Sequence, residues 1–186
     1  TVLHEVDLTI KDGEFVAIVG PSGAGKSTLL YQLSLLDTPT AGEIYLDEHK
    51  TSGLNEKEKT ALRLGKLGYV FQDYALLPEL PALENVMLPM MVAGLSRHEA
   101  RRKAIKALEK VRLADKLANK PSALSGGQQQ RVAIARAIAH EPKILFADEP
   151  TANLDSASAE PVMDAFKELN HAGQTIVMVT HEEEYA

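Results

Sequence analysis

The strongest constraint on the fold is a nine-residue segment near the start of the chain, Gly20-Pro21-Ser22-Gly23-Ala24-Gly25-Lys26-Ser27-Thr28. It fits the pattern G-x-x-x-x-G-K-[ST], in which backbone N–H groups surround a phosphate, the lysine reaches the outer phosphates and the next hydroxyl binds Mg²⁺. Such a loop needs a buried strand before it and a helix after it. The flanks agree, because 15–19 is a short apolar run typical of a buried strand and 26–33 continues as a helix. The sequence therefore predicts a phosphate loop that ends at a helix N-terminus.

Three further apolar runs have the composition of buried strands, namely 67–71, 143–147 and 175–179. Helical segments lie between them. Strands that alternate with helices predict an α/β fold with a mainly parallel sheet, whose ligands bind beyond the carboxyl ends of the strands. The phosphate loop, Asp148 and His181 all follow strands, so we expect them at the same edge of the sheet.

The middle of the chain, 74–124, offers helices without a clear strand and is interpreted as an inserted helical lobe. Ser96 and Glu99 have the spacing of a capping box, which starts a helix. Pro89 lies inside another helical segment and should kink or divide it.

The whole chain, 1–186, is interpreted as one domain, because 186 residues that are 45% hydrophobic can bury a substantial core. Its two expected lobes are a core lobe, 1–73 with 141–186, and a helical lobe, 74–140. Thr1 leads directly into an alternating apolar pattern and the chain stops soon after a strand, so we expect it to be trimmed at both ends.

Composition excludes several classes of function. The net charge of −6 argues against nucleic acid as a partner, because phosphate backbones are met by basic surfaces. Cysteine is absent, which excludes disulfides and thiolate metal sites. No apolar run approaches the roughly 18 to 20 residues that cross a bilayer, and no signal peptide precedes the first strand. We therefore expect a soluble chain whose membrane role comes through a partner.

Two carboxylates, Asp148 and Glu149, come directly after the strand 143–147. Burying a carboxylate is costly unless a cation compensates its charge, and Mg²⁺ prefers oxygen ligands. An acidic strand end that faces solvent is the alternative. Gln72 and His181 also follow strands, although a lone glutamine at such a position can be an ordinary loop residue.

A second motif, Leu124-Ser125-Gly126-Gly127-Gln128, lies far downstream of the phosphate loop. Ser125 and Gln128 have capping-box spacing, so the motif is expected to begin a helix that runs to about His140 and offers a second anion-binding end. The motif resembles the hallmark sequence of ATP-binding cassette (ABC) ATPases. With it, the phosphate loop (Walker A), Gln72, Asp148-Glu149 (Walker B), the segment 152–155 and His181 follow that family's order over essentially the whole chain.

The resemblance implies an ABC ATPase fold and a role for each of these residues in the binding and hydrolysis of ATP with Mg²⁺. Asp148 and Ser27 would hold Mg²⁺, and Glu149 would polarise the attacking water as general base. Gln72 would touch Mg²⁺ or that water, and His181 would contact the γ-phosphate. Asp155 would cross a dimer interface, although an aspartate there can also cap the following helix.

The resemblance also implies partners. In ABC ATPases two subunits pair head to tail, and each ATP lies between Walker A of one subunit and the hallmark motif, here 125–128, of the other. We therefore expect a homodimer or a pseudo-symmetric dimer on an integral membrane permease at the cytoplasmic face of the membrane. The leading function is the ATPase of a transport system; the alternative is a regulatory scaffold of the cell-division type without solute transport. A soluble small-molecule kinase is disfavoured, because it would leave the hallmark motif without a purpose.

Within the family, Leu77-Pro78 and the segment 82–86 look like the branch of lipoprotein-releasing, macrolide-exporting and cell-division ATPases. The chain also departs from the family pattern. The aromatic residue that stacks on adenine would lie upstream of Thr1, and the usual C-terminal strands are missing. Glu182 stands where aspartate is common, and Pro161 lies near the start of a late helix.

Overall fold

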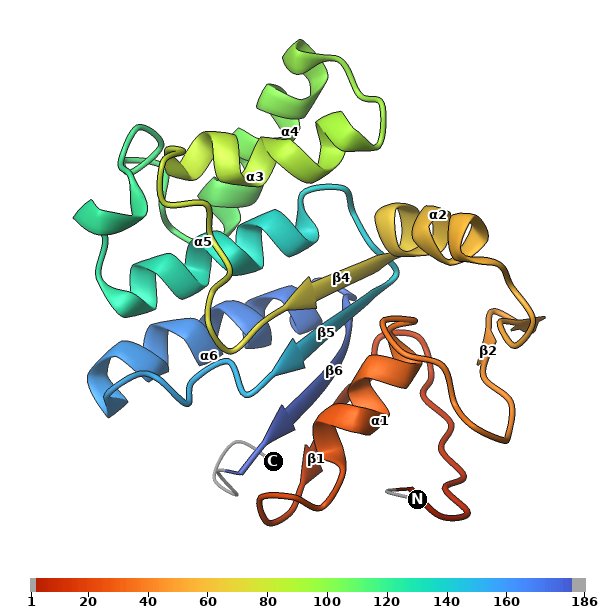
Figure 1. Cartoon of the computed structure of the whole chain (residues 1–186). Helices are drawn as coiled ribbons and strands as arrows, with labels where there is room; N and C mark the ends of the chain where they lie inside the picture. Colours follow the sequence, from red (N-terminus) through yellow and green to blue (C-terminus); the bar gives the residue numbers. More distant parts are fainter. Residues whose placement is uncertain (1–2, 182–186) are drawn as a thin grey trace.

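Four parallel strands form the central sheet of the computed structural model, which describes residues 3–181 (Figure 1). The order of the strands in the sheet is β1 (Phe15–Val19), β6 (Thr175–Thr180), β5 (Ile144–Asp148) and β4 (Leu67–Val70). The arrowheads of β4, β5 and β6 point the same way in Figure 1, so their carboxyl ends share one edge. The predicted α/β fold with a mainly parallel sheet is confirmed, and each predicted strand lies within one residue of its observed bounds.

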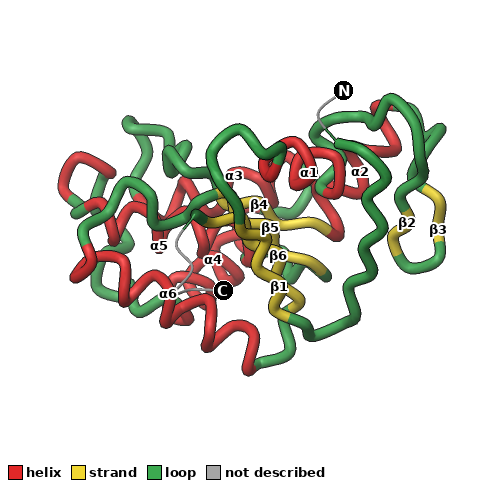
Figure 2. The backbone as a smooth tube through the Cα atoms, turned by 90° about the horizontal axis from the view of Figure 1, so that it is seen from below, coloured by secondary structure: helices red, strands yellow, loops and turns green. Residues whose placement is uncertain are grey.

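Both faces of the sheet are buried, because the side chains of each strand alternate between two apolar clusters. Ile176 and Met178 belong to the cluster that contains helices α3 to α6, whereas Val177 and Val179 belong to the cluster that contains α1. This period of two is the pattern of a pleated strand covered on both sides. Figure 2 shows the strands in the middle with helices to either side of them.

The helices of the described chain are α1 (Lys26–Leu33), α2 (Glu56–Lys66), α3 (Ala82–Val92), α4 (Arg97–Lys110), α5 (Gly126–Ile138) and α6 (Ser156–His171), with a short 3₁₀ turn, η1 (Pro121–Ala123). A two-stranded antiparallel hairpin, β2 (Tyr45–Leu46) with β3 (His49–Lys50), stands apart from the central sheet. Residues 74–124 contain helices and no strand, as the sequence predicts. None of the helices within 3–181 has the length and apolarity that a membrane span requires.

The predicted helix starts are confirmed at α4 and α5. Ser96 with Glu99, and Ser125 with Gln128, form complete capping boxes in which each serine oxygen accepts a backbone N–H and each partner side chain returns to the serine N–H. These contacts fix the first turn of both helices.

Pro89 does not divide its helix, so that part of the expectation is wrong. α3 runs unbroken from Ala82 to Val92 with Pro89 inside it. An interior proline costs about 3 kcal/mol, but each apolar side chain buried along α3 returns about 1.5–3 kcal/mol. Val86, Met87 and Met90 are all buried against the neighbouring helices, and their packing outweighs the missing hydrogen bond.

Candidate functional site

The phosphate loop connects the end of β1 to the start of α1. Gly23 and Gly25 have φ of +81° and +91°, a conformation that favours glycine. Gly25 is the N-cap of α1, and within the described residues no side chain caps this helix and no acidic residue occupies its first turn. Its first N–H groups are therefore left for an anion, in the place that the sequence predicts.

Lys26 holds its ammonium group inside this loop. The side chain is almost completely buried, and Nζ donates to the carbonyl oxygens of Gly20 (2.8 Å) and Pro21 (3.1 Å). Nζ also lies 3.9 Å from Oε1 of Glu149. The loop therefore contains a fixed positive charge beside free backbone donors, which is the chemistry that binds phosphate.

Ser27 and Asp148 are brought together from segments that are far apart in the sequence. Ser27 Oγ donates to Asp148 Oδ1 at 3.0 Å, and the hydroxyl of Tyr69 lies 3.4 Å from Asp148 Oδ2. Burial, followed by the charge of Asp148, raises the pKa of the Tyr69 phenol, so its hydroxyl stays a donor. No group of three His, Cys, Asp or Glu side chains within 3–181 forms a metal site. A hydroxyl beside one carboxylate nevertheless suits Mg²⁺, which takes one or two protein oxygens and completes its shell with waters and phosphates.

Glu149 lies next to these groups in a strained backbone conformation. Its φ is +43°, and its N–H donates to the carbonyl of Val179 at 2.9 Å. Its Oε2 lies 3.2 Å from Nδ1 of His181, at the end of β6. Positive φ at a non-glycine residue is uncommon and persists where the surroundings fix it, often at functional sites. The carboxylate thereby lies between Lys26 of the phosphate loop and His181.

The structure does not bring the side chain of Gln72 to the other residues of this site. Its backbone carbonyl accepts from Asn153 Nδ2 at 3.2 Å. Its side chain is exposed and, in the part of the chain that is described, makes no hydrogen bond to Ser27 or Asp148. Of the three predicted metal ligands, Ser27, Gln72 and Asp148, the structure therefore joins two.

The hallmark motif packs against neighbouring loops and the first turn of α6 in its own chain. A Cβ on Gly126 would lie 3.0 Å from the Tyr74 hydroxyl and from Cδ2 of Leu154, and one on Gly127 would lie 2.9 Å from the carbonyl oxygen of Ser158. Within 3–181 the motif makes no hydrogen bond to the phosphate loop. The two segments are thus separate in one subunit.

Asp155 caps α6, one of the two roles that the sequence left open. Its Oδ1 accepts from the Ser158 N–H at 2.8 Å, and hydrogen bonds from the Ser158 hydroxyl and N–H lower the pKa of the carboxyl. Its predicted contact across a dimer interface stays a prediction.

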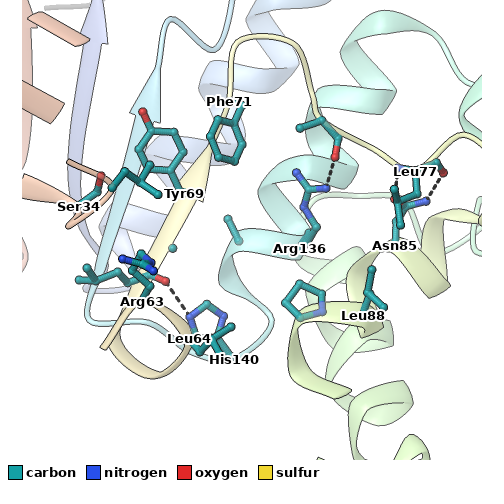
Figure 3. Close-up of a pocket in the computed structure, with 16 residues that line it drawn as sticks. Ser34, Arg63, Leu64, Tyr69, Phe71, Leu77, Asn85, Leu88, Arg136 and His140 are labelled. Carbon is teal, nitrogen blue, oxygen red and sulfur yellow. Dashed lines mark hydrogen bonds between the residues drawn. The ribbon is translucent and has the colours of Figure 1, made fainter. Parts of the chain in front are cut away.

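An apolar groove of about 440 Å³, which sequence reasoning missed, lies between α2, β4, α3 and the end of α5 (Figure 3). Arg136 lies at its wall and donates to the backbone carbonyls of Tyr74 and Ala75, two consecutive residues with positive φ. His140 Nε2 donates to the carbonyl oxygen of Leu67 at 3.0 Å. The groove therefore adjoins the segment that follows Gln72. No sequence signal marks it, because its lining comes from four distant segments.

Comparisons with known proteins agree with this arrangement. The family model described as "ABC transporter" matches residues 3–152. The lipoprotein-releasing system ATP-binding protein LolD of Aquifex aeolicus is 55% identical over 185 residues, which is 100% of this chain and 83% of that protein. The uncharacterized ABC transporter ATP-binding protein YknY of Bacillus subtilis is 52% identical over 185 residues, which is 100% of this chain and 80% of that protein. A dimeric structure of the ATP-binding cassette MJ0796 of Methanocaldococcus jannaschii, in a post-hydrolysis state bound to ADP and Pi, superposes with a TM-score of 0.88 at 49% identity and covers 100% of this chain and 82% of that one.

Proposed function

The chain belongs to the ABC transporter family as an ATP-binding subunit, and we propose that it hydrolyses ATP with Mg²⁺ at the site formed by Lys26, Ser27, Asp148, Glu149 and His181. The observation that carries this proposal is the meeting of a buried lysine, a hydroxyl–carboxylate pair and a second carboxylate at one edge of the sheet. Binding phosphate explains the lysine and the free N–H groups of α1. Hydrolysis explains the second carboxylate.

Each residue has a chemical task in this proposal. The N–H groups of residues 23–28 and the ammonium of Lys26 bind the β- and γ-phosphates. Ser27 and Asp148 would hold Mg²⁺, which supplies neutralising charge to the phosphates. Glu149 accepts a proton from the attacking water, and His181, which touches Glu149, faces the γ-phosphate. The side chain of Gln72, which is exposed in this structure, would have to turn toward the site.

The hallmark residues 125–128 would complete the site of a second subunit. The N-terminus of α5 makes no hydrogen bond to its own phosphate loop in the described chain, and the superposed MJ0796 cassette is dimeric. Two-fold pairing would create two equal composite sites. ATP would hold the pair together, because contacts to the γ-phosphate from both sides exist only before hydrolysis.

A membrane subunit is the proposed recipient of this conformational change. The groove presents exposed apolar side chains, and among its lining residues there are arginines and a histidine but no carboxylate. The nearby Val92 is 68% exposed. We propose that the membrane partner docks here, beside the loop that carries Gln72, and that the chain is thereby held at the cytoplasmic face of the membrane. The division into a core lobe, 1–73 with 141–186, and a helical lobe, 74–140, stays a prediction, with this groove at their junction.

Phosphate release from Mg-ATP by the purified chain tests the function. We expect turnover that depends on Mg²⁺, and second-order dependence on protein concentration if the dimer is the active form. Absence of turnover, with ATP binding demonstrated by calorimetry, would contradict hydrolysis by this chain. Replacing Val92 by aspartate should leave this basal turnover unchanged and abolish co-purification with the membrane subunit.

A further inference from the structure

We propose that Gln130, inside α5, is a positioning residue that holds the loop carrying Gln72 and the turn carrying Glu149 at a fixed separation. It also ties both segments to the helix that begins with the hallmark motif. This inference rests on the proposed ATPase activity and assigns a further residue to it.

The amide of Gln130 connects the two chain segments that follow β4 and β5, just beyond the last paired residues of these strands. The last paired residues of β4 and β5 are Val70 and Ala147. Beyond them, Gln130 Nε2 donates to the carbonyl of Pro150 at 2.9 Å and to the carbonyl of Phe71 at 3.4 Å. Phe71 directly precedes Gln72, and Pro150 directly follows Glu149. One side chain therefore contacts the neighbours of both water-handling residues.

Burial makes this link stiff. Gln130 is completely buried, so bulk water does not compete for the hydrogen bonds of its amide. Its Oε1 is buried without a hydrogen-bond partner in the described structure. A buried unsatisfied oxygen is destabilising, and this offsets much of what the two donated bonds contribute. Stability alone therefore gives little reason for an amide at this position, whereas positioning of two backbone segments does.

A second amide joins the same two segments from the surface. Asn153 Nδ2 donates to the carbonyl of Gln72 at 3.2 Å and to Oδ1 of Asp73 at 3.3 Å. Asn153 lies on the segment that continues from Pro150. The loop after β4 and the turn after β5 are thus held by one buried and one exposed amide.

The position of Gln130 in α5 gives the link a consequence. Ser125, which caps the same helix, lies little more than one turn before Gln130. A shift of this helix end, when it meets the nucleotide of another subunit, would move the segments of Gln72 and Glu149 together. Water positioning in one site would then depend on contact with the other subunit.

Replacing Gln130 by methionine tests the proposal, because methionine has a similar length and donates no hydrogen bond. We expect kcat to fall about 10- to 100-fold, the range that a small misplacement of reacting groups produces. The Kd of ATP should change by less than about twofold, since no group that binds phosphate is altered. Calorimetric unfolding should show a Tm close to that of the wild type. Gln129→Met is the matched control, because within 3–181 the Gln129 amide is hydrogen-bonded to the carbonyl of Leu124 alone, at 3.1 Å. This variant should keep wild-type kcat.

A double-mutant cycle with Glu149→Gln separates positioning from general damage. If Gln130 acts through Glu149, adding Gln130→Met to Glu149→Gln should lower the residual turnover by less than about twofold. The proposal would be overturned if the double variant lowered kcat by the product of the two single factors, or if Gln130→Met had unchanged kcat. Asn153→Ala changes an exposed position and keeps the core intact. A lowered kcat with unchanged ATP affinity in this variant supports the link. If Gln130→Met fails to fold and Asn153→Ala has wild-type kcat, the proposal is overturned. Wild-type turnover in the same assay shows that the proposed function itself holds.

Discussion

Replacing Glu149 by glutamine should remove hydrolysis and leave nucleotide binding intact. The amide keeps the size of the side chain and an oxygen that can still accept from His181, which lies 3.2 Å away. It cannot take a proton from water. A general base contributes about 10²- to 10⁴-fold, so kcat should fall by that factor, which is about 2.7–5.5 kcal/mol of transition-state stabilisation.

The structure indicates that binding and stability change far less. The charge lost is paired with Lys26 at 3.9 Å, a distance at the limit of an ion pair, and its loss should cost about 1 kcal/mol or less. That corresponds to a decrease in Tm of about 2–4 °C for a chain of this length. Removing a carboxylate beside the triphosphate also removes repulsion, so the Kd of ATP should stay equal or decrease.

Three measurements check this reasoning. Phosphate release gives kcat, titration calorimetry gives the Kd of ATP, and light scattering coupled to size exclusion gives the mass with Mg-ATP and with Mg-ADP. We expect slow turnover, normal binding and a dimer only with Mg-ATP. Glu160→Gln is the matched control, since Glu160 is exposed on α6 and, within 3–181, forms no ion pair with Lys26 or His181. Turnover within about threefold of the wild type would refute the assignment of Glu149 as general base, and a monomer under both conditions would refute the composite site.

Lys26→Ala should weaken ATP binding at least about 10-fold, because a charge-assisted contact to phosphate contributes roughly 1.5–3 kcal/mol; unchanged affinity in calorimetry would contradict the phosphate-loop role. Gly68→Ala should destabilise the fold by about 1–3 kcal/mol and lower Tm by about 2–12 °C, because its Cβ would lie 2.5 Å from the carbonyl oxygen of Ala137; a scanning calorimeter that records an unchanged Tm would show that the neighbouring helix moves freely. Burial lowers the pKa of His140 below its usual 6.5, so the unfolded chain takes up the proton first and stability should decrease as pH falls below about 6.5. Urea unfolding at several pH values should show that the free energy of unfolding depends less on pH in His140→Gln than in the wild type. The same pH dependence in both proteins would mean that other groups cause it.

The strands and the phosphate loop could be predicted because their signals are local. An apolar run of five residues, a glycine pattern and a capping box each need only a few neighbours, and the bounds of β1 and α1 agree with the prediction to the residue. The hairpin of β2 and β3 has strands of two residues each, which leave almost no periodic signal. Division of α3 at Pro89 was wrongly expected because the packing of this helix depends on residues of other helices, which local propensity ignores.

The sequence could predict which residues lie at the candidate site, but it could not predict which of their side chains are in contact. Parallel topology alone places Ser27, Asp148 and His181 at one edge, since all follow strands or the phosphate loop. The hydroxyl of Tyr69 at Asp148 and the amide of Gln130 at Pro150 depend on how far each side chain reaches across the sheet or from α5. Tyrosine in a strand and glutamine in a helix carry no motif. Only the assembled fold shows which groups they touch.

The N-termini of α1 and α5 differ in the hydrogen-bond donors that they leave for an anion. α1 leaves its first N–H groups free, with glycine as the N-cap. α5 uses Ser125, whose oxygen accepts the N–H of Gln128 at 3.3 Å. A serine hydroxyl has a proton to donate as well as lone pairs to accept with, and the structure records no acceptor for that proton within 3–181. Capping therefore fixes the oxygen, and in the proposed dimer the proton would be left for a phosphate bound by the other subunit. The structural and the catalytic interpretation of Ser125 are compatible, because each uses a different part of the same hydroxyl.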